Sequence, residues 1–227
     1  MAYTFDFAAV WEYREQLATG ALHTLGLITV GASLGLSLGT LGAVSRAWKI
    51  KPFDKQFTVY VELIRNTPFL VQLFFIFFGL PALGVKLDEW TAAIIAMVVN
   101  LGAYSTEIIR SGIQAIPRGQ IEAASSLAMT RTQIFRHIVL RPALQKVWPA
   151  LTSQVVIVML GSSVCSQISA TELTYAANFI QSRNFRAFET YITVALMYLL
   201  LAFGVRWLLN RFGNRFVVVR RQERTAS

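Results

Sequence analysis

Long apolar segments alternate with short polar segments along almost the whole chain. The first apolar segment, residues 20–44, contains no formally charged residue. At a rise of about 1.5 Å per residue, it is long enough to cross about 30 Å of hydrocarbon as a helix. The same test predicts four further spans, so that the five predicted transmembrane helices cover about residues 20–44, 57–80, 90–111, 147–169 and 188–209. The second is the least apolar, because it contains Glu62, Arg65 and Pro68.

The composition supports an all-α membrane protein. Hydrophobic residues make up 55% of the chain and charged residues only 15%, whereas about a quarter of the residues are charged in soluble proteins. The net charge of +9 would suit a nucleic-acid partner only if the basic residues shared one soluble face. Here apolar segments separate them, so we expect a lipid bilayer and no nucleic acid as partner. Cys165 is the single cysteine, and His23 and His137 lie far apart, so neither a disulfide nor a metal site is expected.

The basic residues predict the orientation of the chain. They gather after the first span (Arg46, Lys49, Lys51, Lys55), after the third (Arg110, Arg118, Arg131, Arg136, Arg141, Lys146) and toward the C-terminus (Arg206, Arg211, Arg215, Arg220, Arg221, Arg224). By the positive-inside rule these three segments are cytoplasmic. The N-terminus is then periplasmic, which agrees with an odd number of spans. It also lacks the basic start and short apolar core of a cleavable signal.

The first span carries a stripe of small residues. Gly31, Gly35 and Gly39 recur every four residues and therefore lie on one face of the helix. Such a stripe allows a second helix to approach closely. Packing within the chain and dimerisation are both compatible with it, and we favour packing within the chain.

The segment of about residues 112–146 is too polar for the bilayer and too short for a catalytic domain. Pro117 predicts a turn, and a short helix from Gln120 to about Met129 follows, with Ile121, Ala124, Leu127 and Ala128 on one face. Thr130 and Gln133 then match a capping box that opens another helix. Two interpretations stand: a pair of helices lying on the bundle, or a helix that docks into a partner. The small side chains and Glu122 in the first turn favour docking.

Two stretches resemble motifs of a known family. These are GAYSTEIIRSGIQAIPRGQIEAA at residues 102–124 and RNTPFLVQLFF at residues 65–75. They look like the polar amino-acid uptake family of type I, binding-protein-dependent ABC importer permeases. The resemblance implies a five-span permease fold over residues 1–227, taken as a single domain. It also implies that the cytoplasmic loop is a coupling helix that fits a cleft of an ATPase subunit, with Gly119, Glu122, Ala123, Ala124, Leu127 and Ala128 at the contact.

The chain departs from the family pattern at three places. Ala128 stands where the family has a glycine, and alanine disfavours a positive φ, so no sharp turn is expected there. The family's Leu-Pro pair is spaced here as Leu140-Arg141-Pro142. Gly161 stands where members that hold an amino acid inside the permease often have a polar or acidic residue, which argues against an intramembrane site on this subunit.

Charged and polar residues inside the spans are candidates for a transport path. Glu62 and Arg65, and likewise Glu107 and Arg110, are spaced i, i+3 on neighbouring spans. They form either two local pairs or a crossed network near an inner gate. The fourth span ends in a polar stretch that we assign to the substrate path, with Gly161, Ser162, Ser163 and Gln167 as its candidates. Alternatively, the serine hydroxyls bond back to helix carbonyls. Glu172 is expected on the outer face.

The chain has no Gly-x-x-x-x-Gly-Lys-Ser/Thr loop and no Gly-Lys dipeptide, so it is predicted not to be an enzyme and to bind no cofactor. ATP and Mg are expected on a separate ATP-binding cassette dimer. The other expected partners are a second permease subunit, identical or paralogous, and a periplasmic solute-binding protein, at the bacterial inner membrane. The alternatives are a stand-alone secondary transporter or channel, for which no internal repeat is visible, and a membrane-embedded enzyme, for which no catalytic cluster is visible.

Overall fold

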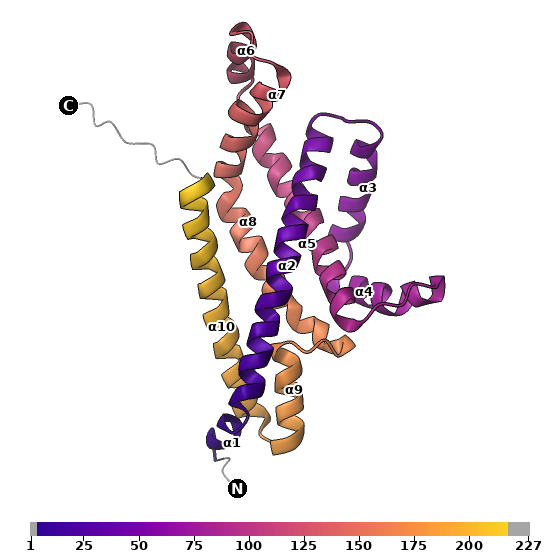
Figure 1. The fold of residues 1–227 in the computed structure, drawn as a ribbon, viewed down its shortest axis with the longest axis vertical. Helices are drawn as coiled ribbons and strands as arrows, with labels where there is room; N and C mark the ends of the chain where they lie inside the picture. Colours follow the sequence, from indigo (N-terminus) through magenta and orange to yellow (C-terminus); the bar gives the residue numbers. More distant parts are fainter. Residues whose placement is uncertain (1–3, 218–227) are drawn as a thin grey trace, which may run out of the picture.

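The computed structural model describes residues 4–217, and every element in that part of the chain is helical. Four helices are long and apolar enough to cross a membrane, and they run along the long axis of the molecule (Figure 1). The prediction of an all-α membrane protein is therefore confirmed. In order, the elements are α1 (Ala8–Trp11), α2 (Arg14–Ala47), α3 (Phe53–Arg65), α4 (Phe69–Phe74), η1 (Phe75–Gly79), η2 (Leu80–Leu83), α5 (Glu89–Gln114), α6 (Arg118–Ser126), α7 (Arg131–Gln133), η3 (Ile134–Leu140), α8 (Arg141–Gly161), η4 (Ser162–Ile168), α9 (Leu173–Asn184), α10 (Ala187–Phe212) and η5 (Gly213–Val217).

Glycines of α2 form the contact with α5. A Cβ atom added at Gly31 or Gly35 would lie 3.3 or 3.0 Å from the Cβ of Met97 or Leu101. At Gly39 it would lie 2.4 Å from the Cβ of Ser105, closer than real atoms come. The glycine stripe of the first span is thus filled by α5 of the same chain, which confirms packing within the chain.

The second predicted span is not one helix. α3 ends at Arg65, the backbone is extended at Pro68, and the segment Phe69–Leu83 leaves at 112° to α3 (Figure 1). The expectation of a continuous helix over residues 57–80 is wrong, because proline disfavours helical geometry in the residue before it. Gln72 stabilises the bend: its amide Nε2 donates to the carbonyls of Ile64 and Thr67, at 2.8 and 3.0 Å.

The helix that corresponds to the fourth predicted span is longer than predicted. It runs from Arg131 to Ile168, so the segment after Thr130 is the start of this helix and not a separate surface helix. The capping box of Thr130 and Gln133 is confirmed at its beginning. Pro142 cannot donate to a preceding carbonyl, and the π-helical turns of η3 immediately before it absorb that lost hydrogen bond.

A helix that the sequence reasoning did not predict packs at the other end of the bundle. α9 lies beside the first turns of α2, where Gly20 approaches it so closely that an added Cβ would lie 3.0 Å from the Cα of Leu173. The Glu172 carboxylate caps α9 by accepting from the backbone N–H of Tyr175 at 2.8 Å. α9 and α10 bury Ala177, Ile180 and Val194 in a common cluster.

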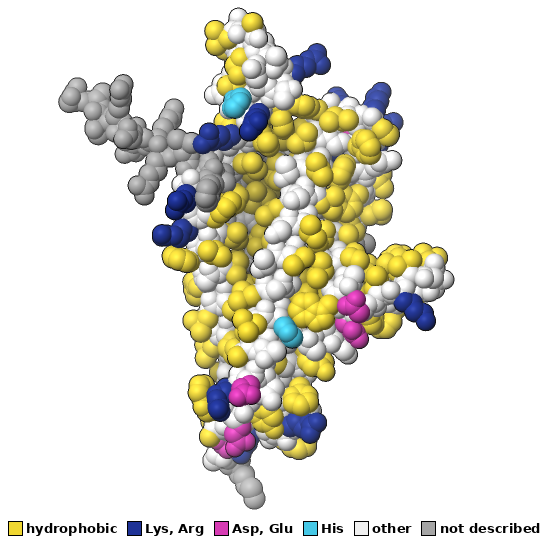
Figure 2. All heavy atoms as spheres, viewed as in Figure 1, with side chains coloured by type: hydrophobic (Ala, Val, Ile, Leu, Met, Phe, Trp, Pro, Cys, Tyr) yellow, Lys and Arg dark blue, Asp and Glu magenta, His cyan; other side chains and the backbone are white. Residues whose placement is uncertain are grey.

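The two ends of the bundle differ in charge. The α2–α3 connection, α6 and the C-terminal end of α10 all lie at the upper end in Figure 1. Figure 2 shows Lys and Arg side chains gathered toward that end, above a middle zone that is mostly hydrophobic. The three basic segments therefore share one end of the molecule. Arg220, Arg221 and Arg224 lie outside the described residues.

Adding one methyl group at Gly39 tests the α2–α5 contact. We expect Gly39→Ala to lower the free energy of unfolding by roughly 1–3 kcal/mol, because its Cβ has no room beside Ser105. Gly26→Ala on the same helix is the matched control: nothing lies within 4 Å of an added Cβ there, and alanine favours the helix. Thermal unfolding in detergent measures both, and equal melting temperatures would contradict the packing argument.

Candidate coupling surface and transport path

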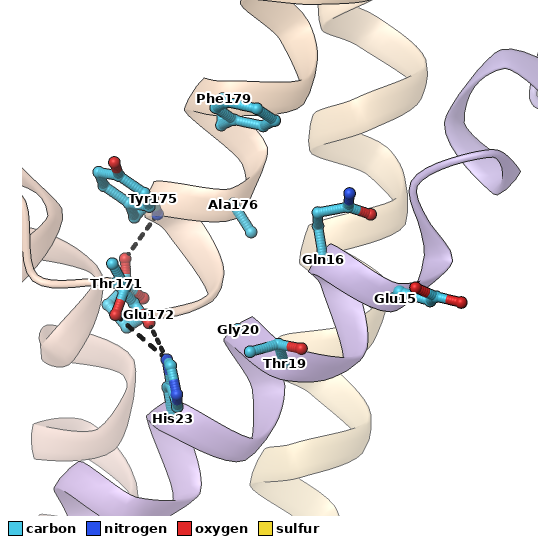
Figure 3. A pocket seen from close by; sticks show the side chains of 10 residues that line it. All are labelled: Glu15, Gln16, Thr19, Gly20, His23, Thr171, Glu172, Tyr175, Ala176 and Phe179. Atoms are coloured by element: carbon cyan, nitrogen blue, oxygen red, sulfur yellow. Dashed lines mark hydrogen bonds between the residues drawn. The ribbon is translucent and has the colours of Figure 1, made fainter.

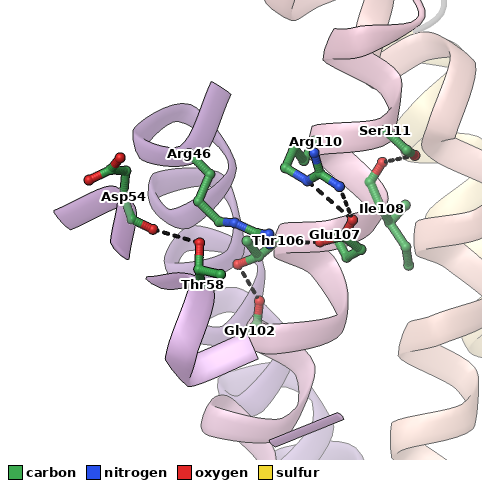
Figure 4. Close-up of polar contacts among 9 residues, drawn as sticks. All are labelled: Arg46, Asp54, Thr58, Gly102, Thr106, Glu107, Ile108, Arg110 and Ser111. Carbon is green, nitrogen blue, oxygen red and sulfur yellow. Dashed lines mark hydrogen bonds and ion pairs between the residues drawn. The ribbon is translucent and has the colours of Figure 1, made fainter. Parts of the chain in front are cut away.

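A small cluster of charged side chains joins α2 to α5 at the basic end (Figure 4). Arg46, in the last turn of α2, donates from Nη1 to the Glu107 carboxylate at 2.7 Å. Arg110 binds the other carboxylate oxygen of Glu107 and also donates to it from Nε at 3.1 Å. All three side chains are at most 26% exposed, so solvent screens their attraction less than at an open surface.

The four residues of the predicted network are only partly brought together. Glu107 and Arg110 are paired, but Arg65 lies over the ring of Tyr104, 5.5 Å from its centre. Among residues 4–217 no ion pair joins Arg65 to Glu107 or to Glu62. The residue that pairs with Glu107 from another helix is Arg46, which lies outside the predicted spans.

A double-mutant cycle distinguishes the two crossings. We expect Arg46→Gln and Glu107→Gln to be coupled by about 0.5–3 kcal/mol in the free energy of unfolding, since they share a partly buried contact. The pair Arg65→Gln and Glu107→Gln is the matched control and should be additive. Thermal or denaturant unfolding supplies the four free energies of each cycle. Additivity of the Arg46 cycle would contradict the contact.

α6 is an amphipathic helix that packs on its own chain. Ala124 is 4% exposed and belongs to the same buried cluster as Ile134 and Val139 of η3. The expectation that Ala124 shares an outward face with Leu127 is therefore wrong. The helix ends at Ser126, which takes Leu127 out of the helical register and leaves it 78% exposed. The outward surface consists of the exposed residues of α6 and of the turn after it, which are Arg118, Gly119, Gln120, Glu122, Ala123, Ser125, Ser126, Leu127 and Ala128.

A sharp turn closes α6 in spite of the missing glycine. Ala128 has φ +56°, in the left-handed region. The Met129 N–H donates to the Ala124 carbonyl at 3.3 Å and the Ala128 N–H to the Ser125 carbonyl at 3.0 Å, which is the Schellman pattern. The expectation that alanine prevents this turn is wrong. The two hydrogen bonds and the burial of Ala124 offset the strain of about 1–2 kcal/mol in an L-residue.

A cavity of about 380 Å³ lies between the bent segment, α5 and α8. Asn100 is at its wall and is fixed there, because its amide Nδ2 donates to Gln72 Oε1 at 3.0 Å. Gly161 also lines it, and nothing lies within 4 Å of a Cβ added at that position. The residues around the cavity are Thr67, Pro68, Phe69, Asn100, Tyr104, Gln154, Ile157, Val158 and Gly161.

The other predicted path residues do not line this cavity. The hydroxyls of Ser162 and Ser163 donate back to the carbonyls of Met159 and Leu160. Gln167 is exposed and follows in the 3₁₀ turns of η4. Of the four candidates, only Gly161 borders the cavity, because its missing side chain leaves the space open. Asn100, Tyr104 and Gln154 were not singled out from the sequence, and only their polarity within apolar spans marks them.

A second cavity, of about 480 Å³, lies between α2 and α9, at the end of the bundle opposite to α6 (Figure 3). His23 binds the Thr171 carbonyl through Nδ1 at 2.6 Å and stands edge-on to Trp90. Glu172 is fully buried here and accepts a hydrogen bond from the Tyr198 hydroxyl. Burial raises the pKa of the Glu172 carboxyl above its usual value. The sequence predicts that Glu172 belongs to the outer face, and the structure shows in addition that its carboxylate is the buried cap of α9.

Residues 19–218 match the family described as "Binding-protein-dependent transport system inner membrane component". The match covers the first spanning helix from residue 19 onward, the other three spanning helices and the bent segment. Within the described residues no group of His, Cys, Asp or Glu is arranged to hold a metal ion.

Three relatives are similar to this chain over most of their length, and each is named as a permease protein. The glutamine transport system permease protein GlnP of Escherichia coli (strain K12) is 33% identical over 217 residues, covering 95% of this chain and 99% of its own length. The L-cystine transport system permease protein TcyB of Bacillus subtilis (strain 168) is 35% identical, with 95% and 96% covered. The probable glutamine ABC transporter permease protein GlnM of Bacillus subtilis (strain 168) is 37% identical, with 87% and 93% covered.

Solved structures agree with the fold. The crystal structure of an amino acid ABC transporter with histidines contains a chain with a TM-score of 0.85 and 36% identity, covering 94% of this chain and all of that one. A chain of the inward-facing MetNI methionine ABC transporter has a TM-score of 0.74, with 90% and 97% covered. At 22% identity the second comparison shows the fold alone.

Proposed function

The chain belongs to the binding-protein-dependent transport system inner membrane components, the permease subunits of ABC importers, and we propose that it carries a polar amino acid or a related compound delivered by a periplasmic solute-binding protein. The names of its relatives support the substrate class, since they transport glutamine and cystine. The resemblance of the sequence motifs supports the same class. On this proposal residues 1–227 act as one transmembrane permease domain.

The observation that carries the proposal is the outward surface of α6. It presents small side chains, the carboxylate of Glu122 and the exposed Leu127 beyond the end of the bundle (Figure 1). A small, knob-like helical surface of this kind fits a groove on another protein. We propose that the groove belongs to an ATP-binding cassette subunit, which holds ATP and Mg, because the chain itself has no phosphate-binding loop.

The orientation follows from the same proposal. The end that carries α6 also carries the three basic segments, and a cytoplasmic location for basic segments is the rule for membrane proteins. The N-terminus, α1 and α9 are then periplasmic, where the solute-binding protein docks. Two copies of the ATP-binding subunit would be matched by two permease chains, identical or paralogous, around a two-fold axis.

Cysteine labelling tests docking and orientation together. Cys165 is fully buried, so an introduced cysteine is the reactive thiol among the described residues. We expect Leu127→Cys to react with a membrane-impermeant maleimide in inside-out vesicles only, and to be protected when the ATP-binding subunit is present. Asp88→Cys is the control. Asp88 lies just before the first residue of α5, at the end of that helix opposite to its basic end, so this cysteine should react from the opposite face without protection.

Each outcome separates the alternatives. Labelling of Leu127→Cys from the periplasmic face would reverse the orientation. Labelling that the ATP-binding subunit leaves unchanged would make α6 a surface helix of the bundle. Solute uptake that continues without ATP would support the stand-alone transporter or channel instead.

We propose that the cavity of about 380 Å³ between the bent segment, α5 and α8, called the central cavity below, is part of the solute path. It brings together polar side chains from three elements at membrane depth, and polar groups there mark a pathway or a site. The charged cluster of Arg46, Glu107 and Arg110 lies at the basic end of α2 and α5, and α5 also borders the cavity, so the cluster is at the place expected for an inner gate. Gly161 has no side chain, and a larger residue at this position would reduce the open volume of the cavity.

Filling the cavity should block the path without unfolding the chain. Gly161→Leu meets no atom at its Cβ and points into the cavity, so we expect uptake to fall roughly 10- to 100-fold, the equivalent of 1–3 kcal/mol of overpacking, while binding of the ATP-binding subunit stays normal. Gly204→Leu is the matched control, since it also meets no atom but lies on the exposed face of α10. Uptake in vesicles measures both, and equal rates would remove the cavity from the path.

A further inference from the structure

One face of α10 ends in a polar groove at the basic end of the bundle. Trp207, Asn210, Arg211, Asn214 and Arg215 line a surface hollow of about 420 Å³. Because they are spaced three and four residues apart, they lie on a single face of the helix and its continuation in η5. Arg211 holds its guanidinium 5.7 Å from the centre of the Trp207 ring.

The opposite face of the same turns is locked to the bundle. Trp148 of α8 donates from its indole Nε1 to the Leu209 carbonyl at 3.1 Å, and its ring centre lies 6.0 Å from that of Phe212. Gly213 is buried against the same indole, so closely that an added Cβ would lie 2.0 Å from Nε1. This packing prevents α10 from turning, so the arginine face is directed away from the other helices.

The outward face continues toward the middle of α10 as an apolar track. Leu196, Leu200 and Phe203 lie on it, and each is more than half exposed. Only 6% of the most apolar window of α10 is buried within the chain. An exposed apolar track of this length on a spanning helix is in contact with lipid chains.

The length of the helix places the arginines at headgroup depth. The helix from Ala187 to Arg215 has 29 residues, about 43 Å at 1.5 Å per residue. The hydrocarbon core takes about 30 Å of a bilayer and the headgroup regions extend it to about 40–45 Å. Twenty residues, about 30 Å, separate Ala187 from Trp207, so with Ala187 at one boundary of the hydrocarbon core Trp207 lies near the other, where tryptophan is enriched, and Arg211 and Arg215 lie beyond it.

We propose that this groove binds the phosphate of an anionic phospholipid, with the acyl chains along Leu196, Leu200 and Phe203. Arg211 and Arg215 are four residues apart, about 6 Å along the helix axis, so that one phosphate can accept from both guanidinium groups. The amides of Asn210 and Asn214 add neutral donors beside it. A free phosphate would use the arginines alone, and the apolar track that leads to them favours a ligand with acyl chains.

A lipid titration tests this site in the full chain. The delipidated protein is titrated in detergent with dioleoylphosphatidylglycerol, dioleoylphosphatidylcholine or inorganic phosphate, and the melting temperature is followed. We expect phosphatidylglycerol to raise it and the other two to have little effect. Arg211→Gln should weaken the lipid effect roughly five-fold, from the attraction of one basic residue, and Arg211→Lys should retain most of it.

Arg206→Gln is the matched control. It removes the same charge from the same helix, but residue 206 is on a different face and does not line the groove. If Arg206→Gln and Arg211→Gln weaken the effect of phosphatidylglycerol equally, the effect depends only on the net positive charge of the helix, and the proposed site is overturned. An equal response to inorganic phosphate or to phosphatidylcholine would also overturn it. A change of oligomeric state in Arg211→Gln, with lipid binding unchanged, would assign the face to a second copy of the chain instead.

Discussion

The close approach of α2 to α5 is the constraint on which the rest of the structure depends. Without hydrophobic exclusion from water, helices in a bilayer associate through packing and polar contacts, so the distance between backbones matters most. Gly31, Gly35 and Gly39 bring α2 against α5 over more than two turns. That approach in turn brings Arg46 within reach of Glu107. It also leaves the other faces of α5 to α3 and α8.

The bend at Pro68 is the second element of this arrangement. A broken helix exposes carbonyls that lipid cannot satisfy. Gln72 satisfies those of Ile64 and Thr67, and Asn100 holds Gln72 from α5. Two of the residues in this hydrogen-bond network, Thr67 and Asn100, also line the cavity. The hydrogen bond between Asn100 and Gln72 thus connects the wall of the cavity to the satisfied bend.

The sequence predicted what depends on local pattern, and missed what depends on distance in space. Four of the five predicted spans, the glycine stripe and the capping box are periodic or short-range features, and the structure contains them, whereas the second span is broken at Pro68. The direction of Ala124 depends on where α6 ends, which differs from the pattern by only a few residues. The partner of Glu107 comes from a helix 61 residues earlier, and no spacing rule within a span reveals it. The burial of Glu172 depends on α9 packing against α2 and α10, which composition does not show.

Ala128 shows where a family pattern and a physical rule lead to different expectations. The rule that alanine avoids positive φ is sound, yet two hydrogen bonds and the packing of Ala124 hold this alanine at +56°. The turn is determined by its surroundings and not by the residue alone. For the same reason, the shifted proline of Leu140-Arg141-Pro142 is accommodated by π-helical turns within the helix and does not end it.

The unbroken helix from Arg131 to Ile168 has a mechanical consequence. Its 38 residues form a rod about 57 Å long, which packs against α6 near one end and borders the central cavity at Gly161 near the other. A rod of that length converts a tilt of about 5° into a displacement of about 5 Å at its far end. The π-helical turns at residues 134–140 and Pro149 are the compliant points along it, since the regular hydrogen-bond ladder is interrupted there. Both compliant points lie between the α6 end of this helix and Gly161, so the part of the helix that contacts α6 and the part that borders the cavity are separated by interruptions of the hydrogen-bond ladder.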